Sequence, residues 1–251
     1  MIALIDADIV TFRCAASCKE GDGPEISNLR ADILMRQIIE ETQAESYRAF
    51  LSGSRNFRYD IYPEYKANRR DIPRPVHLQS CREFLVTEWN ATVTDGYEAD
   101  DALGIAQTQE MQVGFEDGDE ERPFIYGTII SSIDKDLLAI PGRHHNIVSK
   151  EIIEVSPLKA LRTFYKQLLL GDRSDNVPGF DGVARQKPTN FLKGCYEKID
   201  SLDNEVAMFE FVREIYDEHG EAEHLTRNAR LLHILRKEDD KWQEPSSIKS
   251  L

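Results

Sequence analysis

The 251-residue sequence lacks long hydrophobic runs, and no apolar stretch approaches the ~18 residues that a membrane helix needs. The N-terminus, Met-Ile-Ala-Leu-Ile-Asp, also lacks the basic lead and small-residue cleavage site of a signal peptide. We therefore expect a cytoplasmic protein with no membrane partner, whose first residues form a strand. Hydrophobic residues at 41% and charged residues at 30% fit a globular chain with a substantial core.

Cysteine and histidine are scarce. The four cysteines, at positions 14, 18, 81 and 195, include one helically spaced pair but no second pair to complete a zinc site, so we expect reduced thiols. His144 and His145 lie in Pro-Gly-Arg-His-His-Asn, which is typical of a loop, and we do not expect them to bind a metal. A Gly-rich nucleotide-binding loop and internal repeats are absent from the sequence.

Basic residues are also few: the sequence has 31 Lys and Arg but 45 Asp and Glu, which gives a net charge of −14. Phosphate binding depends on Lys and Arg, so this total by itself argues against a nucleic-acid partner. The distribution changes that conclusion. Six basic residues outnumber three acidic ones between positions 55 and 74: Arg55, Arg58, Lys66, Arg69, Arg70 and Arg74 against Asp60, Glu64 and Asp71.

Nine acidic residues gather in four short motifs. They are Asp6 and Asp8 after the apolar start, Glu98, Asp100 and Asp101 in Gly-Tyr-Glu-Ala-Asp-Asp, Asp134 and Asp136 in Ile-Asp-Lys-Asp-Leu-Leu, and Asp172 and Asp175 before a Pro-Gly break. Ionised carboxylates brought together repel one another unless cations lie between them. Such ligands select Mg²⁺, with Mn²⁺ as a substitute, rather than zinc.

Hydrophobic patterning predicts an α/β fold, a mainly parallel sheet flanked by helices. Residues 2–5, 47–51, 91–94 and 124–130 have the composition of strands, and 26–45, 76–87 and the stretch after 97 that of helices. A parallel strand delivers Asp6 to the carboxyl edge of the sheet. Asp8 is either a second ligand or the N-cap of a helix from Ile9. Asp134 and Asp136 would point to one face if the chain there is extended.

The remainder of the chain is predicted to be helical or irregular. Residues 112–123 have the polar, acidic composition of a loop, and 146–155 that of a strand or hairpin. Helices are expected after Leu158, over 205–216 and over 221–236, the last two with no motif that we can decode.

Five segments occur in an order and spacing that resemble the 5′ nuclease (flap endonuclease) family, which includes phage 5′→3′ exonucleases and the 5′ nuclease domain of bacterial DNA polymerase I. They are Leu4–Asp8, Tyr62–Arg69, Gly96–Gly104, Asp134–Leu138 and Gly171–Gly179. The resemblance covers residues 1–195. It implies a PIN-like sheet with a helical arch and a C-terminal helix–hairpin–helix region. The resemblance also implies that the protein is a monomer that hydrolyses DNA with the help of metal ions and leaves 5′-phosphate and 3′-hydroxyl ends. The process it implies is DNA replication or repair.

The resemblance assigns roles to individual residues. Asp6, Glu98, Asp100 and Asp134 would hold a first Mg²⁺, and Asp136, Asp172 and Asp175 a second, with Asp101 serving either and Asp8 a less regular ligand. Lys66 and Arg69, on one helical face of the arch segment 57–75, would act on the scissile phosphate; a solvated basic face is the alternative. Arg13 matches a family Arg, and Tyr65 would stack on bases or belong to the core.

Residues 180–191 resemble the element with which the family holds duplex DNA. Gly179, Gly182 and Lys187 match it, and the resemblance implies K⁺ there; a loop between structural helices is the alternative. We therefore expect a catalytic core over 1–160 that includes the arch, and a DNA-binding helical region over 161–251. The substrates implied are DNA with 5′ ends or 5′ flaps, and an RNA primer–DNA hybrid.

The chain departs from the family pattern at several positions. Ser52 follows the second strand where relatives carry Asp, and Asp8 is the residue that could replace it. Ile133 replaces a Gly, and Ala184 and Pro188 are unusual in the hairpin. Two other functions therefore stay open at this point: a PIN-type ribonuclease, and a non-catalytic, structure-specific DNA-binding protein.

Overall fold

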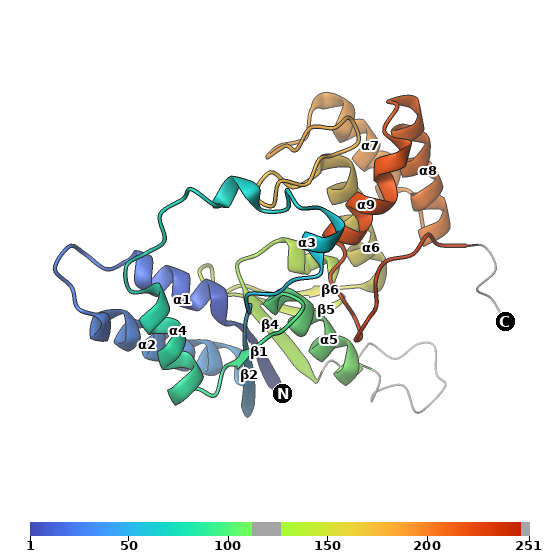
Figure 1. Ribbon diagram of the computed structural model, residues 1–251. Coiled ribbons are helices and arrows are strands. Elements are labelled where there is room, and N and C mark those ends of the chain that lie inside the picture. Colours follow the sequence, from blue (N-terminus) through green and yellow to red (C-terminus); the bar gives the residue numbers. More distant parts are fainter. Residues whose placement is uncertain (112–126, 247–251) are drawn as a thin grey trace. The chain divides into compact units, whose positions relative to one another are not determined.

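The computed structural model describes residues 1–111 and 127–246 (Figure 1). The elements in chain order are β1 (Ile2–Asp6), α1 (Ala7–Ala16), α2 (Pro24–Thr42), β2 (Ser46–Leu51), α3 (Arg58–Ile61), η1 (Ala67–Arg69), α4 (Leu78–Glu88), β3 (Thr92–Val93), α5 (Ala99–Met111), β4 (Thr128–Ser132), η3 (Asp136–Ala139), β5 (Gly142–Asn146), β6 (Ile152–Val155), α6 (Pro157–Leu170), α7 (Asn190–Asp200), α8 (Glu205–Glu218) and α9 (Ala222–Leu232). None of the helices described is long and apolar enough to cross a membrane.

The chain divides into two compact units. The first unit contains residues 1–56, 73–155 and 235–238, and the second contains 57–72, 156–234 and the described part of 239–251. The arch segment is thus grouped with the C-terminal helices, whereas the sequence placed it with the core. The functional domains expected from the sequence remain a prediction.

The first unit is built on a six-stranded sheet of order β3-β2-β1-β4-β5-β6, in which only the β5–β6 pair is antiparallel. This confirms the expected mainly parallel sheet. The strand order reverses between β1 and β4, and in open parallel sheets such a switch point leaves a crevice at the carboxyl ends of the strands. Asp6 ends β1, and Asp134 lies two residues after the end of β4.

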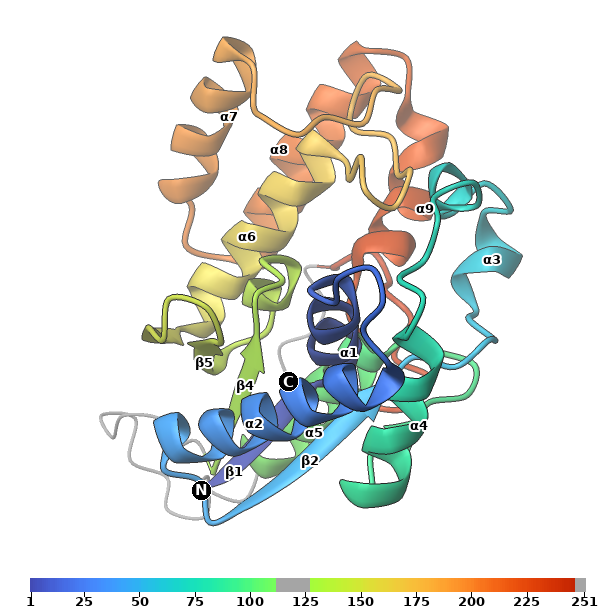
Figure 2. The same ribbon diagram turned by 90° about the vertical axis from the view of Figure 1, so that its left-hand side faces the viewer.

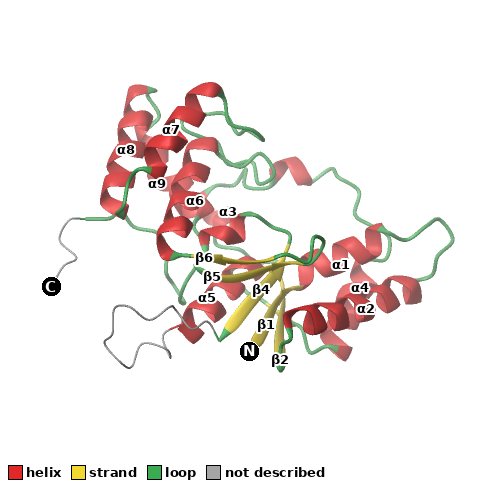
Figure 3. Cartoon of the chain, turned by 180° about the vertical axis from the view of Figure 1, so that it is seen from behind, coloured by secondary structure: helices red, strands yellow, loops and turns green. Residues whose placement is uncertain are grey.

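Helices cover both faces of this sheet (Figure 3). Helices α1, α2 and α4 pack together on one face, as Figure 2 also shows, and α5 packs on β1, β2 and β4 from the other. The core between the sheet and the three helices is mainly apolar, with Ile5, Val10, Met35 and Leu85 among the residues that have no exposed surface. The buried sheet fixes where the carboxyl ends of β1 and β4 lie.

The second unit is a group of helices around α6. Its buried side chains recur at helical spacing, Phe164, Leu168 and Leu169 among them, and α7, α8 and α9 pack against it. The buried hydroxyl of Tyr216 donates to the carbonyl of Leu168 at 2.8 Å, which fixes α8 on α6. The helices expected after Leu158 and over 205–216 and 221–236 are confirmed, the last ending earlier, at Leu232.

Two expectations about local structure were wrong. The residues around His144 form strand β5 rather than a loop, because both histidines are buried between β4 and β6. Residues 57–72 form only the short helices α3 and η1, and Lys66 between them is left-handed with φ 54°, so Lys66 and Arg69 do not share the face of one helix.

For Asp134 and Asp136, a common direction was expected only if the chain there is extended. Asp136 begins the 3₁₀ helix η3, so that condition is not met at Asp136. The loop expected over 112–123 lies outside the described residues, as does the start of the strand expected from residue 124.

Candidate active site

Asp6 is the centre of the acidic residues in the first unit. Its Oδ1 accepts a hydrogen bond from the amide of Ile9 at 3.1 Å, and its Oδ2 accepts one from the hydroxyl of Ser132 at 2.7 Å. Burial, with smaller contributions from the charges of Asp8 and Asp134, raises the pKa of Asp6 to about 7 against the opposing effect of the two hydrogen bonds. Asp6 is therefore a carboxyl group whose charge a nearby cation would stabilise.

Asp8 does not cap α1, because Asp6 occupies the N-cap position. The carboxylate of Asp8 instead forms an ion pair with Arg82 and accepts a hydrogen bond from the amide of Ser52 at 2.9 Å. Arg82 also donates to the carbonyl of Ser52 at 2.6 Å. Asp8 thus contacts the position where the family Asp is missing, which supports the idea that it replaces that acid.

Ser52 connects this position to α5. Its hydroxyl accepts a hydrogen bond from the amide of Ala99, the first residue of α5, at 2.9 Å. Within the same turn, the amide of Glu98 donates to Oδ2 of Asp101 at 3.0 Å. Glu98 and Asp100 are partly exposed, whereas Asp101 is completely buried. The three acids of this motif therefore lie in different environments.

Ser132 joins β1 to the segment after β4. Besides donating to Asp6, its hydroxyl accepts a hydrogen bond from the amide of Asp134 at 3.0 Å. The carboxylate of Asp134 then accepts from the amide of Asp136 at 2.9 Å. Sequence reasoning missed Ser132 and Arg82, and it noted Ser52 only as a departure from the family pattern. The position of Ser132 at the end of β4, and of Ser52 just after β2, could have indicated that these serines lie at the edge of the sheet that carries the acids. Nothing in the sequence pointed to Arg82.

The donor set in the first unit consists of carboxylate oxygens, which suit hard divalent cations such as Mg²⁺. Asp6 is buried, and the charges of Asp8 and Asp134 add to the rise in its pKa. Across the described ranges 1–111 and 127–246, no three Asp, Glu, His or Cys side chains are close enough to hold an ion as they stand. Ion binding therefore requires some of these side chains to rotate toward one another.

In the second unit, Asp175 is surrounded by groups of the arch segment. Its carboxylate accepts a hydrogen bond from the hydroxyl of Tyr65 at 2.7 Å, forms an ion pair with Arg69, and lies 3.5 Å from Nζ of Lys66. The backbone adds to this, because the amide of Lys66 donates to the carbonyl of Asp175 at 2.8 Å. Tyr65 is 2% exposed, which supports its alternative assignment to the core.

The arch segment is fixed further by neighbouring bonds. Asn68 and Arg69 donate to the carbonyls of Arg173 and Ser174 at 2.7 and 2.8 Å. Arg58, counted above as part of a basic surface, is buried and donates to the carbonyls of Leu231 and His233 at the end of α9. Arg58 therefore has a structural role and does not contribute to a basic surface.

Asp172 organises the loop after α6. Its Oδ1 accepts hydrogen bonds from the amide and the hydroxyl of Ser174 at 2.6 and 2.7 Å, and its backbone pairs with Val177. The loop is closely packed: a Cβ on Gly179 would lie 2.5 Å from the carbonyl oxygen of Leu169, so only glycine fits there.

The remaining candidate DNA-binding residues differ in exposure. Gly179 is buried and its amide donates to the carbonyl of Val183, while Gly182, which has φ 75°, donates to the carbonyl of Gly179. Both amides are thus used within the loop. Lys187 and Arg13 are exposed.

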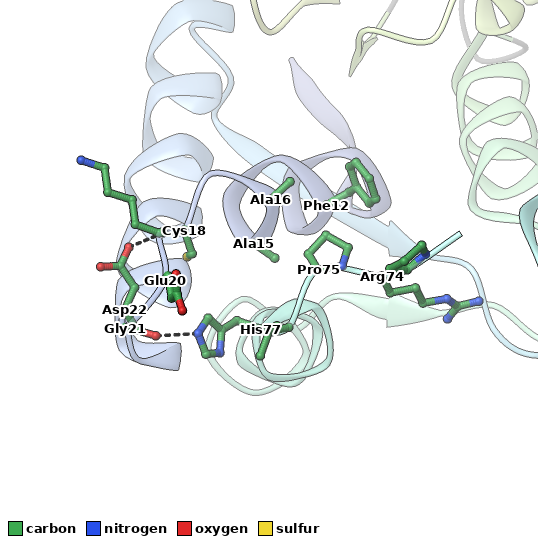
Figure 4. A pocket seen from close by; sticks show the side chains of 13 residues that line it. Phe12, Ala15, Ala16, Cys18, Glu20, Gly21, Asp22, Arg74, Pro75 and His77 are labelled. Atoms are coloured by element: carbon green, nitrogen blue, oxygen red, sulfur yellow. Dashed lines mark hydrogen bonds between the residues drawn. The ribbon is translucent and has the colours of Figure 1, made fainter. Parts of the chain in front are cut away.

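A pocket of about 680 Å³ lies beside α1, whose residues Phe12, Ala15 and Ala16 contribute to its lining (Figure 4). It is lined by Phe12, Cys18 and the segment from Pro73 to His77, where the ring of His77 bonds the carbonyl of Asp22 at 2.7 Å. No acidic motif residue lines it. The acidic residues at the sheet edge, and not this pocket, are therefore the candidate active site.

Comparison with known proteins identifies the family of this chain. Residues 1–166 match the family described as the 5′-3′ exonuclease, N-terminal resolvase-like domain. DNA polymerase I of Chloroflexus aurantiacus is 30% identical over 191 residues, which cover 68% of this chain and 19% of that protein. A 5′-3′ exonuclease of Buchnera aphidicola is 25% identical over 224 residues, which cover 82% of this chain and 74% of that protein. The chain spans about a fifth of the length of the DNA polymerase I relatives it matches.

Solved structures share the fold. The T5 D15 protein co-crystallised with metal ions has a TM-score of 0.63 and 16% identity, covering 92% of this chain and 88% of that one. A T5 D15 flap endonuclease in a pseudo-enzyme-product complex with DNA and metal ions has a TM-score of 0.60 at the same identity and coverage. With two thirds of its length matched by the family model, the chain belongs to the 5′-3′ exonuclease family, in its N-terminal, resolvase-like domain.

Proposed function

We propose that this protein is a metal-dependent 5′→3′ exonuclease and flap endonuclease that hydrolyses DNA to 5′-phosphate and 3′-hydroxyl ends. The observation that carries the proposal is the position of Asp6 and Asp134 at the switch point of the sheet, linked by the hydroxyl of Ser132. Support comes from the family match and from the DNA and metal ions named for the T5 flap endonuclease structure.

The proposed ions are two Mg²⁺, for which Mn²⁺ substitutes. Asp6, Glu98, Asp100 and Asp134 hold the first, with Asp8 replacing the family Asp at Ser52. When bound, such ions lower the pKa of a water molecule and stabilise the leaving oxygen. The protein itself supplies no Ser, Cys or His nucleophile in this proposal. Its carboxylates orient the reacting groups, and Ser132 keeps Asp6 and the segment of Asp134 in register.

The cations of the second unit bind the substrate in this proposal. Lys66 and Arg69 now share the carboxylate of Asp175, and a phosphate group offers them a second anionic partner. Lys187 and Arg13 are exposed and suit contacts with the DNA backbone. In finer detail, we propose that Asp136, Asp172 and Asp175 are ligands of the second ion and that K⁺ binds near Gly179. We also propose an RNA primer–DNA hybrid as a further substrate, a monomeric state and a cytoplasmic location.

The experiment that tests the proposal compares strand polarity. Blunt duplexes labelled at the 5′ or the 3′ end, and a 5′-flap duplex, are digested with and without Mg²⁺ at several salt concentrations. We expect Mg²⁺-dependent release of short product from the 5′-labelled end and cutting near the base of the flap, both falling steeply with salt. Early loss of the 3′ label would refute the proposal. Cleavage of RNA without flap preference would favour a ribonuclease, and binding without cleavage a non-catalytic DNA-binding protein.

A further inference from the structure

Residues 235–238, here called the C-terminal strap, pack with the first unit although the chain on both sides of them belongs to the second. They lie outside the part of the chain that matches the family, and no sequence motif marks them. Within the first unit, however, the strap bonds to both of the segments that carry candidate ion ligands on α5 and after β4.

The first bond reaches α5. The buried amide of Leu235 donates to Oδ1 of Asp101 at 3.0 Å. The other oxygen of the same carboxylate accepts the amide of Glu98 at 3.0 Å. Asp101 has no exposed surface, and water cannot replace either partner of a buried bond without a large cost. Asp101 therefore fixes the backbone of Glu98 and of the strap at the same time.

The second bond reaches η3. The guanidinium of Arg236 donates to the carbonyl of Ala139, the last residue of η3, which begins at Asp136. Carbonyls at the end of a helix lack a partner within the helix, so a charged donor there stabilises that end. Leu235 is 4% exposed, which holds the neighbouring Arg236 in place.

We propose that the C-terminal strap sets the spacing between the Glu98–Asp101 turn and the Asp134–Ala139 segment, and that Asp101 and Arg236 are positioning residues for the ion ligands on these segments. In this chain, Asp101 acts on Glu98 through the backbone rather than as an ion ligand. The inference rests on the proposed function, because it assigns the strap to the same acidic site. It explains why residues without a motif are bonded to both acidic segments.

The test uses the full chain, free of metal, and compares Arg236→Ala with Arg230→Ala. Arg230 is a matched control, because its Nε also donates to a backbone carbonyl, that of Trp242, within the second unit. Amide hydrogen exchange, Mg²⁺ affinity by calorimetry, and DNA affinity are measured for each. Arg236→Lys, which keeps the charge, replaces Arg236→Ala if the latter does not fold.

For Arg236→Ala we expect amide hydrogen exchange to become about tenfold faster at residues 98–102 and 134–140 and nowhere else, because losing the bond allows these two segments to open locally. We also expect Mg²⁺ affinity to fall by about tenfold, with DNA affinity unchanged. Arg230→Ala should change none of these. Unchanged exchange in both segments, or a uniform increase across the first unit, would overturn the proposal.

Asp101→Asn separates a positioning residue from an ion ligand. The Nδ2 of Asn cannot accept a hydrogen bond, so this change should release the amide of Leu235 or of Glu98 and speed its exchange in the metal-free protein. Weaker Mg²⁺ binding with no change in exchange would make Asp101 a ligand and overturn the proposal. If the unmodified protein binds no Mg²⁺, the proposed function fails, whereas the exchange pattern still decides the role of the strap.

Discussion

At the scale of single residues, the candidate site is a set of carboxylates that differ in what their neighbours do to them. Asp6 is buried and is the N-cap of α1, and Asp8 forms an ion pair with Arg82. Asp101 accepts hydrogen bonds from two amides, and Asp134 is exposed. Only the last can change its charge without disturbing a buried contact. Asp134 is therefore the best position for testing catalysis separately from folding.

Asp134→Asn should lower the single-turnover cleavage rate by at least about 100-fold, the usual loss for a group that supports charge in the transition state. DNA affinity measured with Ca²⁺ in place of Mg²⁺ should stay the same. Thermal stability of the metal-free protein should not fall, because removing one acid relieves the repulsion on Asp6. Lys135→Gln, at the exposed neighbouring position, is the control. Turnover like that of the unmodified protein in the Asp134 variant would remove Asp134 from the site.

Lys66→Ala tests whether this cation acts on the reacting phosphate. If it does, the single-turnover rate should fall by about 100-fold while DNA affinity changes little. Arg70, which is exposed and donates to the carbonyl of Pro63, provides the control, and Arg70→Ala should leave both values nearly unchanged. Equal small losses of rate and affinity for Lys66→Ala would indicate a phosphate contact with no catalytic role.

At the scale of elements, one carboxylate, that of Asp175, contacts three side chains of the arch segment. Asp175→Asn removes the charge that Arg69, Lys66 and Tyr65 share, and losing one charge-assisted bond costs about 1.5–3 kcal/mol. Since 1.4 kcal/mol corresponds to a factor of about ten, trypsin should cleave after Lys66, Arg69 or Arg70 roughly ten times faster. Tyr65→Phe, which keeps the charge, should have a smaller effect. An unchanged cleavage rate for Asp175→Asn would mean that backbone bonds alone hold the segment.

The sequence predicted long, strongly patterned elements well and short ones poorly. The parallel sheet and helices α2, α6 and α8 follow from apolar periodicity and were expected. Strand β5 was missed because Gly142 and the two histidines resemble a loop, and only burial between two strands makes them a strand. The arch was expected to be one helix, but its contacts with Asp175 place Lys66 in a left-handed conformation.

The candidate site was predictable as a list of residues and not as an arrangement. Asp6 and Asp134 were predicted as site residues because each follows an apolar strand. The partners of these acids and of Asp8 are ordinary residues whose roles depend on packing between distant segments: Ser132 contacts Asp6 and Asp134, and Ser52 and Arg82 contact Asp8. The contact between Leu235 and Asp101 joins residues too far apart in sequence for any local pattern to reveal.

At the scale of the whole molecule, stability should depend on pH through His145. Burial lowers the pKa of His145 in the folded protein, which outweighs the opposing charge of Glu41, 3.2 Å from its Nε2. At His145 the unfolded chain then binds more protons than the folded one as pH falls through about 6.5, so this residue lowers the free energy of unfolding in that range. Asp6, whose pKa is raised, acts in the opposite direction over the same range, so the effect of His145 is obtained by comparison with the His145→Gln variant. Urea unfolding at pH 5.5 and 8 measures this. His145→Gln should reduce the difference, and His224→Gln, at a more exposed site, should not. A pH dependence that His145→Gln leaves intact would contradict this assignment.

The position of β1 in the sheet also bears on how the chain folds during synthesis. β1 is a central strand, yet its neighbour β4 begins more than a hundred residues later in the chain, at Thr128, which pairs with Ile2. A ribosome must therefore add more than a hundred residues while one edge of β1 stays open. During that interval, Asp6 lacks its bond from Ser132. The two sides of the acidic site thus form only when β4 docks, so a chain stalled before that strand lacks the assembled acidic site.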